Sequence, residues 1–462
     1  MMVLPLGILW FGAVLLAVLD GTRVKNAVLA IVVLILAILA TIWLGIDVWS
    51  NGTREMVIGG WDPGVGISLR IDTLGIIFAT LSLFVLLAAL IFETANRIRA
   101  RIFPALVLFM GVGLTGLFFT GDAFNFYVFF EIAMVSAYVL ASYGETPRQL
   151  RAAFLFIVVN LLGSMLFLIA IAALYHITGR LDMVGIETQM PLVAESPATL
   201  IATIMFIAFS IKLGLFPFHF WLAPVYTGTR PSVAAMLSGA LANIGTYGLL
   251  RFGADILPRE LEHGAPVLIV LGVVSIIYGA VQSISRHSPS EVLAYSAIGQ
   301  VGYIMIALAI GGEAGYVAVI LYAVINALNK GLLFLSVSLR GWLVGATFVV
   351  GAFSVAGVPP AAGFLGKIAI FWAAVEDNAW SITALVFLGS ALSFLYMFQL
   401  YRRRFWVPKE DEQVSSTLPQ VIVSAMAIGL LVIGLWPDPL LDLTSHAVAG
   451  LLEATPFKES QP

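Results

Sequence analysis

The stretch FNFYVFFEIAMVSAYVL, residues 124–140, contains one charged side chain, Glu131, in the middle of an uncharged run. A helix of this length covers roughly 25 Å, close to the thickness of the hydrocarbon core of a bilayer. An ionised carboxylate that faced lipid at such a depth would cost roughly 2.5 to 3.5 kcal/mol on insertion scales. The stretch therefore predicts a membrane-spanning helix whose glutamate faces the interior of the protein.

The composition of the whole chain predicts the same environment. Of 462 residues, 61% are hydrophobic and only 11% are charged, whereas an average soluble domain has about 25% charged residues. Lipid offers no hydrogen-bond partners to the backbone, so helices are the simplest spanning structure. Apolar runs between charged breaks give about fourteen spans of near-bilayer length. One of them covers 232–250 and leaves Arg251 in the connection that follows, and the last covers 419–436. We expect an all-α polytopic membrane protein.

Cysteine and histidine usage limits the chemistry. The chain has no cysteine, and its five histidines include no pair at metal-ligand spacing, which excludes disulfides, iron–sulfur clusters and thiolate zinc sites. We expect no metal, no cofactor and no catalytic chemistry in the chain itself. We also expect no nucleic-acid partner; the surroundings are the lipid bilayer.

The basic residues predict the orientation. Lysine and arginine gather in the odd-numbered connections between spans, for example at 97–101 and 402–404. The positive-inside rule places these connections in the cytoplasm and both termini outside. We expect a multi-pass protein of a prokaryotic plasma or inner membrane.

Three lysines lie inside predicted spans, namely Lys212, Lys330 and Lys367, and Glu131 is the only deep carboxylate that we expect. Charges at this depth are costly in lipid, so they usually face the bundle interior and mark ion or proton pathways. A structural ion pair, or a side chain that snorkels to the membrane surface, is the alternative for each.

Prolines interrupt two spans that carry these lysines. In FSIKLGLFPFHFWLAPVY (209–226), Pro217 and Pro224 follow Lys212. Proline has no backbone N–H, so it breaks the helical ladder and leaves carbonyls free to bind water or charge. We expect a broken helix here.

The second interruption is GVPPAAGFLGK (357–367), in a predicted span, 342–374, that is too long for one straight helix. Pro359–Pro360 precede Lys367 and predict a second broken helix. One broken helix in each half of a chain indicates internally repeated transporter architecture, roughly 103–250 against 265–401.

Five stretches of the chain carry a resemblance to a known family. They are TGDAFNFYVFFEI, FSIKLGLFPFHFWLAPVY, AYSAIGQVGYI, NALNKGLLFL and GVPPAAGFLGK. Together they resemble the proton-conducting antiporter-like subunits, a family that comprises Mrp-type Na⁺/H⁺ antiporter subunits, their relatives in membrane-bound hydrogenases, and the large membrane-arm subunits of complex I. The resemblance covers about 103–405, and the first and fourth stretches are most similar to the D-type subunits of Mrp antiporters.

The resemblance implies two inverted five-helix repeats, each with a proline-broken helix. The first repeat would occupy 102–253 and the second 264–406. N-terminal transmembrane helices (1–101) and a C-terminal helix and tail (407–462) would flank them. The resemblance also implies partners, which are other membrane subunits of a hetero-oligomeric assembly.

The resemblance assigns roles to the four buried charges. Glu131 matches the glutamate of the fifth span and Lys212 the lysine of the seventh, a pair that couples conformation or charge to proton movement. Lys330 matches the lysine of the central path, and Lys367 the lysine of the exit-side proton site. A lysine whose acidic partner approaches and withdraws can load and release a proton, so we expect Glu131 and Lys212 to pair across two helices.

Other polar residues are candidates for lining the path. Asn243 and Asn326 stand where the family usually has lysine and often has histidine, and asparagine cannot titrate. Either water carries the proton past them, or the path is cut. His219 could relay protons or be satisfied by backbone carbonyls. The remaining path-lining candidates are Tyr295, Ser296 and Gln300.

Three functions follow. The favoured one is a proton-translocating subunit of a multisubunit Na⁺/H⁺ antiporter of the Mrp type. The second is the same role in a redox-driven complex, a membrane-bound hydrogenase or complex I relative. The third is a scaffold that has lost conduction, a reading favoured by Asn243 and Asn326. The residues leave open which cation is exchanged.

Overall fold

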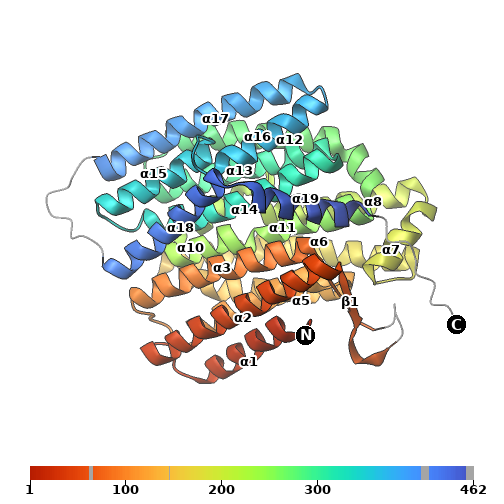
Figure 1. Ribbon diagram of the computed structural model, residues 1–462, viewed down its shortest axis with the longest axis horizontal. Coiled ribbons are helices and arrows are strands. Elements are labelled where there is room, and N and C mark those ends of the chain that lie inside the picture. The colour runs from red at the N-terminus through yellow and green to blue at the C-terminus, as the bar shows by residue number, and fades with distance from the viewer. Residues whose placement is uncertain (62–65, 145, 407–415, 454–462) are drawn as a thin grey trace.

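The computed structural model describes residues 1–61, 66–144, 146–406 and 416–453, and Figure 1 shows a bundle of helices. Within these residues, eleven helices are long and apolar enough to cross a membrane, and three shorter apolar helices accompany them, Leu4–Val18, Phe103–Phe119 and Trp342–Ala356. This confirms the prediction of an all-α polytopic membrane protein with about fourteen spans.

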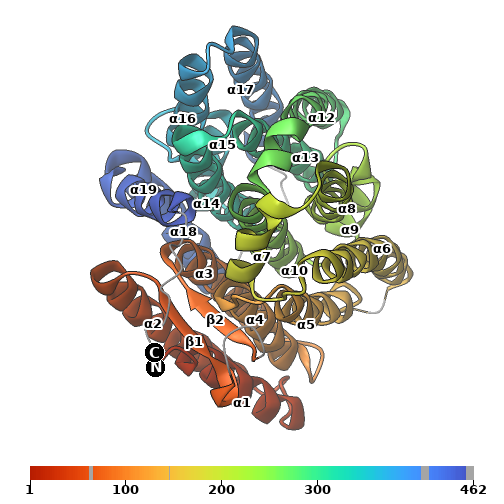
Figure 2. The ribbon, with the colours of Figure 1, turned by 90° about the vertical axis from the view of Figure 1, so that its right-hand side faces the viewer.

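The first half of the chain begins with long helices and contains a two-stranded sheet that was not predicted. Strands β1 (Arg54–Val57) and β2 (Ser68–Ile71) pair antiparallel, with Arg54 opposite Ile71. They lie at one end of the bundle together with the short helix α7 (Met183–Gln189), and we call this the hairpin end (Figure 2). The helices of this part are α1 (Leu4–Val18), α2 (Val24–Asn51), α3 (Thr73–Ala95), α4 (Phe103–Phe119), α5 (Ala123–Ala141) and α6 (Pro147–Thr178).

Side-chain caps fix where the helices begin. Asp72 accepts a hydrogen bond from the Gly75 N–H at 2.8 Å at the start of α3, and Asp122 accepts one from the Asn125 N–H at 2.7 Å at the start of α5. Such caps satisfy backbone donors that have no partner inside the helix. Both caps lie at the hairpin end, where the Gly121 N–H donates to the Ser68 carbonyl at 2.9 Å.

The first predicted break is present. Helix α8 (Glu195–Leu213) ends at Gly214, which has φ +69°, and a 3₁₀ turn over Phe218–Trp221 leads into α9 (Leu222–Gly228). The Trp221 indole N–H donates to the Ile211 carbonyl at 2.9 Å. The indole therefore satisfies a carbonyl near the broken end of α8.

The next span is longer than predicted. The expected helix over 232–250 continues to Ile256 as α10 (Pro231–Met236), a π-helical segment (Leu237–Leu241), α11 (Asn243–Gly248) and a second π-helical segment, η5 (Leu249–Ile256). π-Bulges are frequent at functional sites. Because the helix continues, it carries Arg251 into the protein interior, whereas the charge pattern predicted this residue in a connection.

The second half contains the second predicted break. Helix α15 (Trp342–Ala356) ends at Gly357, which has φ +76°, and α16 (Gly363–Glu376) begins after the proline pair. The other helices here are α12 (Pro258–Ser285), α13 (Pro289–Ile310), α14 (Gly312–Ser336) and α17 (Trp380–Tyr401).

The C-terminal part contains one helix more than predicted. Helix α18 (Thr417–Leu435) matches the expected last span, and α19 (Asp438–Leu452) follows it and packs against α3 and α14. Helix α18 also meets the second break directly, because the Ala362 N–H donates to the Leu430 carbonyl at 3.0 Å. At Gly434 a Cβ atom would lie 2.0 Å from the Pro360 carbonyl oxygen, so the close approach requires glycine.

Three spans form the inside of the bundle. The central windows of Pro231–Ile256, Pro289–Ile310 and Gly312–Ser336 are 94%, 89% and 89% buried, whereas those of the peripheral spans α12 and α17 are 39% buried. In Figure 2, α10 and α14 lie near the middle of the bundle, between α3–α6 on one side and α12–α17 on the other. Polar side chains on these inner helices are therefore shielded from lipid.

Candidate functional site

The three lysines predicted from the sequence are all buried. Lys212, Lys330 and Lys367 are 7%, 8% and 5% exposed, which excludes snorkelling to the membrane surface. Glu131 is partly exposed, and its Oε1 atom is buried with no hydrogen-bond partner among the described residues. These four charges are candidates for a site because buried charges normally need partners.

Lys212 has its hydrogen bonds on α6. Its Nζ atom donates to the Asn160 carbonyl at 2.7 Å and to the Ser164 hydroxyl at 3.2 Å, and lies 4.3 Å from the centroid of the Phe130 ring. The approach is possible because α6 has glycine at position 163, where a Cβ atom would lie 3.3 Å from the Lys212 Cε atom.

The expected ion pair between Glu131 and Lys212 does not form in this structure. No ion pair links the two residues, both of which are described, although they are near enough to interact electrostatically. The physical reason is that the ammonium of Lys212 is already bonded to α6 by a carbonyl and a hydroxyl. Glu131 also lies near Tyr127 and Tyr138 of its own helix, and Tyr138 lies beside Ser164.

A small cavity of about 10 Å³ adjoins Lys212, lined also by Phe130, Phe156, Asn160 and Trp221. This volume holds about one water molecule. His219 does not line this cavity. Its ring stacks on Phe216 at 5.2 Å and lies 4.5 Å from Tyr278, and its Nδ1 atom is buried without a hydrogen-bond partner among the described residues.

Lys330 lies in a second cavity of about 10 Å³, and here the structure brings four predicted residues together: Ser296, Gln300, Asn326 and Lys330. Within the described chain, neither a hydrogen bond nor an ion pair reaches the Lys330 ammonium. Tyr295 lies elsewhere, with its ring 4.9 Å from the guanidinium of Arg286.

Three polar side chains lie between the Lys330 cavity and Lys367, and the hydroxyl of one of them, Tyr303, is buried with no hydrogen-bond partner among the described residues. Tyr322 donates a hydrogen bond to Gln300, the rings of Tyr322 and Tyr303 lie 5.4 Å apart, and Lys367 Nζ lies 4.8 Å from the Tyr303 centroid. Lys367 also donates to the Ala356 carbonyl at 3.3 Å, at the broken end of α15. We call Gln300, Tyr322 and Tyr303 the tyrosine series.

The tyrosines of this region were not predicted from the sequence. Tyr396 shares a hydrogen bond with Ser296 at 2.9 Å and accepts one from Gln300 at 3.3 Å. A signal for Tyr322 was present, because Tyr322, Asn326 and Lys330 recur every four residues and so share one face of α14.

The connection between Lys212 and Lys330 is aromatic. Trp221 lines the first cavity and Phe334 the second, and the Tyr226 ring lies 6.3 Å from Trp221 and 5.5 Å from Phe334. Asn243 does not line either cavity, and its side-chain amide donates to the Gly239 carbonyl of its own helix at 2.9 Å. Aromatic side chains therefore lie between the two cavities, and Asn243 lines neither of them.

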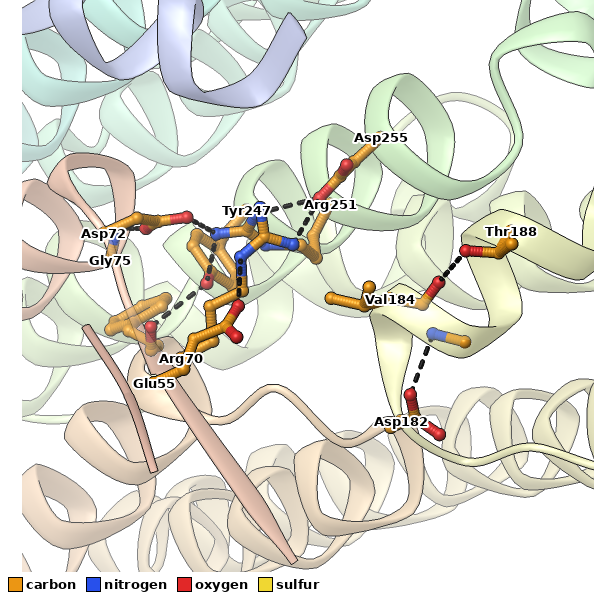
Figure 3. Close-up of polar contacts among 12 residues, drawn as sticks. Glu55, Arg70, Asp72, Gly75, Asp182, Val184, Thr188, Tyr247, Arg251 and Asp255 are labelled. Carbon is orange, nitrogen blue, oxygen red and sulfur yellow. Dashed lines mark hydrogen bonds and ion pairs between the residues drawn. The ribbon is translucent and has the colours of Figure 1, made fainter. Parts of the chain in front are cut away.

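A buried ion cluster at the hairpin end was not predicted. Arg251 is 1% exposed, and Figure 3 shows its guanidinium between Asp72 and Asp255. The N–O distances are 2.5 Å to Asp72 and 2.9 Å to Asp255, and Arg251 also donates to the Tyr247 hydroxyl at 3.1 Å. Arg70 joins the cluster more loosely, at 3.8 Å from Asp255.

The cluster changes the pKa values of carboxyl groups at the membrane boundary. Burial opposes ionisation of Asp72, but the charges of Arg251 and Arg70 outweigh it and hold the Asp72 pKa below its usual value. Glu187 on α7 has no such direct partner. Burial, together with repulsion from Asp255, raises the Glu187 pKa to about 7.

A further buried carboxylate is Glu93, which is 1% exposed and lies near the C-terminal end of α3. Glu93 pairs with Arg230 at 3.1 Å and accepts hydrogen bonds from Ser232 at 2.6 Å and Tyr143 at 3.2 Å. Both carboxylate oxygens of Glu93 therefore have partners, and the bonds to Arg230 and Ser232 join α3 to the segment that follows the first broken helix.

The helices that carry these charges match a known protein family. Residues 120–342 and 341–393 match the family described as NADH:quinone oxidoreductase/Mrp antiporter, transmembrane. The chain belongs to this family. The match covers α5 to α17 almost completely, and so includes both broken helices and all three buried lysines.

Individual members of the antiporter family resemble the chain along nearly its whole length. It is 28% identical to the D-type Na⁺/H⁺ antiporter subunit of Alkalihalophilus pseudofirmus over 455 residues, 92% of this chain and 91% of that one. A chain of the Mrp complex from a Dietzia species has a TM-score of 0.89 at 24% identity, covering 98% of both chains. A chain of respiratory complex I from Thermus thermophilus has a TM-score of 0.79 at 25% identity, covering 96% of this chain and 100% of that one.

Proposed function

We propose that the chain is the proton-translocating membrane subunit of a multisubunit Na⁺/H⁺ antiporter of the Mrp type. The observation that carries the proposal is the run of buried titratable groups from Glu131 through Lys212 and Lys330 to Lys367, within a family fold. The similarity to a protein named as a Na⁺/H⁺ antiporter subunit of the D type supports the antiporter assignment. Buried charges of this kind are costly and are usually retained for ion pathways.

The contacts of Lys212 support a role for this residue in taking up and releasing the proton. Lys212 bonds to the Asn160 carbonyl, and it also feels the charge of the Glu131 carboxylate, which is the second acceptor in our proposal. When the ammonium moves to the carboxylate, the charged form of the lysine is stabilised, and when it returns to the neutral carbonyl that stabilisation falls. Lys212 can thus take up and release a proton in response to its position.

In the second half, Lys330 and Lys367 exchange the proton along the tyrosine series, where water has to complete the path at the Tyr303 hydroxyl, which has no hydrogen-bond partner in the described chain. Gln300 and Tyr322 are hydrogen-bonded, and the Tyr303 ring lies against Lys367. Asn326 cannot titrate, but it lines a cavity large enough for about one water molecule, which can hand a proton past it. Water can therefore replace the histidine that the family often has at this position.

The assembly and orientation belong to the same proposal. We assign both termini to the outside of the plasma membrane, which places the hairpin end outside and the connections rich in arginine in the cytoplasm. Contacts among these connections support one shared basic end, since Arg403 donates to the Arg286 carbonyl at 2.8 Å. The repeats are 102–253 and 264–406, each with one broken helix. The partners are other membrane subunits.

The likeness to complex I concerns the fold, so the redox-driven alternative has less support than the antiporter. The scaffold alternative is tested by Lys330→Met in the complete complex, with cation-driven proton flux measured in everted vesicles. We expect flux to be lost while assembly on native gels is unchanged. The exposed Lys25→Met is the matched control and should keep full flux. Full flux from Lys330→Met would establish the scaffold and reject the proposal.

A further inference from the structure

Five aromatic side chains fill the bundle between Lys212 and the hairpin end, and each is at most 1% exposed. Their ring centroids form a connected cluster with neighbouring distances from 4.9 Å, between Phe167 and Phe209, to 6.2 Å, between Phe126 and Tyr247. We call them the aromatic barrier: Phe126 of α5, Phe167 of α6, Phe209 of α8, Tyr247 of α11 and Phe252 of η5.

The order of residues along the helices places the barrier on one side of Lys212. Phe209 precedes Lys212 by three residues on α8, which begins at the hairpin end just after α7. Phe167 follows Ser164 by three residues on α6, toward the same end. Each ring therefore lies about one helical turn closer to the hairpin end than the residues around Lys212.

The barrier is closely packed. At Gly248 a Cβ atom would lie 2.3 Å from the Phe209 ring, so the ring occupies the space that any other side chain would need. The cavity beside Lys212 is lined by Phe130, whose ring lies 6.2 Å from Phe167, and by no residue of the barrier. A proton that left Lys212 in this direction would have to cross the phenylalanine rings of the barrier, which offer no hydrogen-bonding partner, and this crossing is costly.

The buried ion cluster holds one member of the barrier in place. The Tyr247 hydroxyl donates to the Phe118 carbonyl at 3.1 Å and accepts from Arg251 at 3.1 Å. Arg251 is in turn fixed by Asp72 and Asp255 (Figure 3). The proton path proposed above does not use this cluster. Burying so many charges requires several compensating contacts, so the cluster needs another explanation.

We propose that the aromatic barrier isolates Lys212 from the hairpin end of the membrane, and that the Arg251 cluster holds the barrier closed through Tyr247. The inference rests on the proposed function, in that Lys212 carries protons. It adds a set of positioning residues that do not touch the proton themselves. Their role is to prevent the first half of the chain from leaking protons between transport steps.

The test is a passive leak assay with the complete complex in proteoliposomes, without any exchanged cation. A potassium diffusion potential drives protons, and a trapped pH-sensitive dye records their flux. Phe209→Ala and, independently, Phe252→Ala should raise the leak several-fold over wild type. Asp72→Asn should raise it less, because the charge that fixes Arg251 is removed while the rings remain. Assembly is checked on native gels for every variant.

Two controls separate a specific barrier from general loosening. Phe348→Ala truncates an equally buried phenylalanine of α15, in the other half of the chain, and should leave the leak unchanged. Combining Phe209→Ala with Lys212→Met should return the leak to the wild-type level, because protons reach the barrier from Lys212.

Each other outcome overturns the inference. An unchanged leak in assembled Phe209→Ala and Phe252→Ala would mean that the rings are only core packing, as would an equal leak in Phe348→Ala. A leak that persists with Lys212→Met would mean that the barrier does not isolate this lysine. Cation-driven exchange is measured separately, so that retained exchange in Lys212→Met alone would reject the proposed function while the leak results stand.

Discussion

Lys212 on α8 donates a hydrogen bond to the main-chain carbonyl of Asn160 on α6 at 2.7 Å, rather than forming an ion pair with Glu131 on α5. A neutral carbonyl and a hydroxyl therefore hold this ammonium, and the nearby carboxylate is left with a buried oxygen that lacks a hydrogen-bond partner in the described chain. Under the proposed function, this arrangement is one of two positions of the lysine, and Glu131 is the acceptor in the other.

The first prediction concerns that acceptor. Glu131→Gln keeps the size of the side chain but removes the charge that would draw Lys212 away from Asn160. We expect loss of cation-driven proton flux with normal assembly, because the contacts of Lys212 to α6 do not involve Glu131. Flux in everted vesicles that contain all partner subunits is the measurement. Full flux from this variant would exclude Glu131 as the acceptor.

The second prediction concerns Lys367. Lys367→Ala removes the ammonium at the end of the tyrosine series, and Lys367→Arg replaces it with a group that does not release its proton. We expect both variants to lose flux. Assembly of the alanine variant should be intact, since no ion pair of Lys367 is broken among the described residues. If either variant supported wild-type flux, the second half of the chain would not conduct through this residue.

The third prediction uses Gly357, at the second break. Its φ of +76° is a conformation that would be strained for any residue other than glycine at this position. A Cβ atom there would also lie 2.6 Å from the Lys367 Cδ atom. Gly357→Ala should cost about 1–2 kcal/mol from the backbone alone and displace Lys367, so we expect reduced flux and a lower melting temperature.

The matched control for this variant is Gly7→Ala in α1, where no atom would lie within 4 Å of the new Cβ. Because alanine favours helix, this change should leave flux and melting temperature equal to or above wild type. Equal behaviour of the two variants would show that Lys367 does not depend on the space at Gly357.

The fourth prediction is a pH dependence at the hairpin end. Burial and Asp255 raise the Glu187 pKa to about 7 in the folded state, against about 4.3 in the unfolded chain. The folded state therefore binds the extra proton between these values, and its stability should fall as pH rises from about 4.3 to about 7. Because Glu187 is partly exposed, solvent screening limits the effect to about 1 kcal/mol.

Glu187→Gln should remove this contribution, so the variant should melt above wild type at pH 8 and equal to it near pH 4.5. Thermal unfolding of the purified complex in detergent at both pH values measures the difference. If Glu187→Gln melted at the same temperature as the wild-type protein at pH 8, the Glu187 carboxyl would be solvated and would ionise without cost.

The features that could be predicted from sequence are those with local causes. Pro217 and Pro359–Pro360 break their helices because proline lacks an N–H, whatever surrounds it. The three lysines were found because a charge in an apolar run has only a few stable settings. The four-residue spacing of Tyr322, Asn326 and Lys330 is a local signal of the same kind, although Tyr322 was not predicted from it.

The features that could not be predicted depend on partners far away in the chain. Arg251 was expected in a connection just after a span, and its burial is explained by Asp72, which is 179 positions earlier, together with Asp255 on its own helix. Strands of four residues each are too short for a periodic signal. Whether Lys212 bonds to Glu131 or to Asn160 is decided by the packing of α6 against α8, to which no motif refers.

The contact between α18 and the second break has a consequence for biosynthesis. The Ala362 N–H and the Pro360 carbonyl meet α18 at Leu430 and Gly434, roughly seventy residues later in the chain. A backbone donor exposed in lipid is unfavourable, so the loop that joins the two pieces of the broken helix is completed only after the last helices have been synthesised and inserted. Ribosome-bound chains that end before Leu430 should therefore hold this loop in an immature form, and the C-terminal helices act as the closing step of membrane insertion.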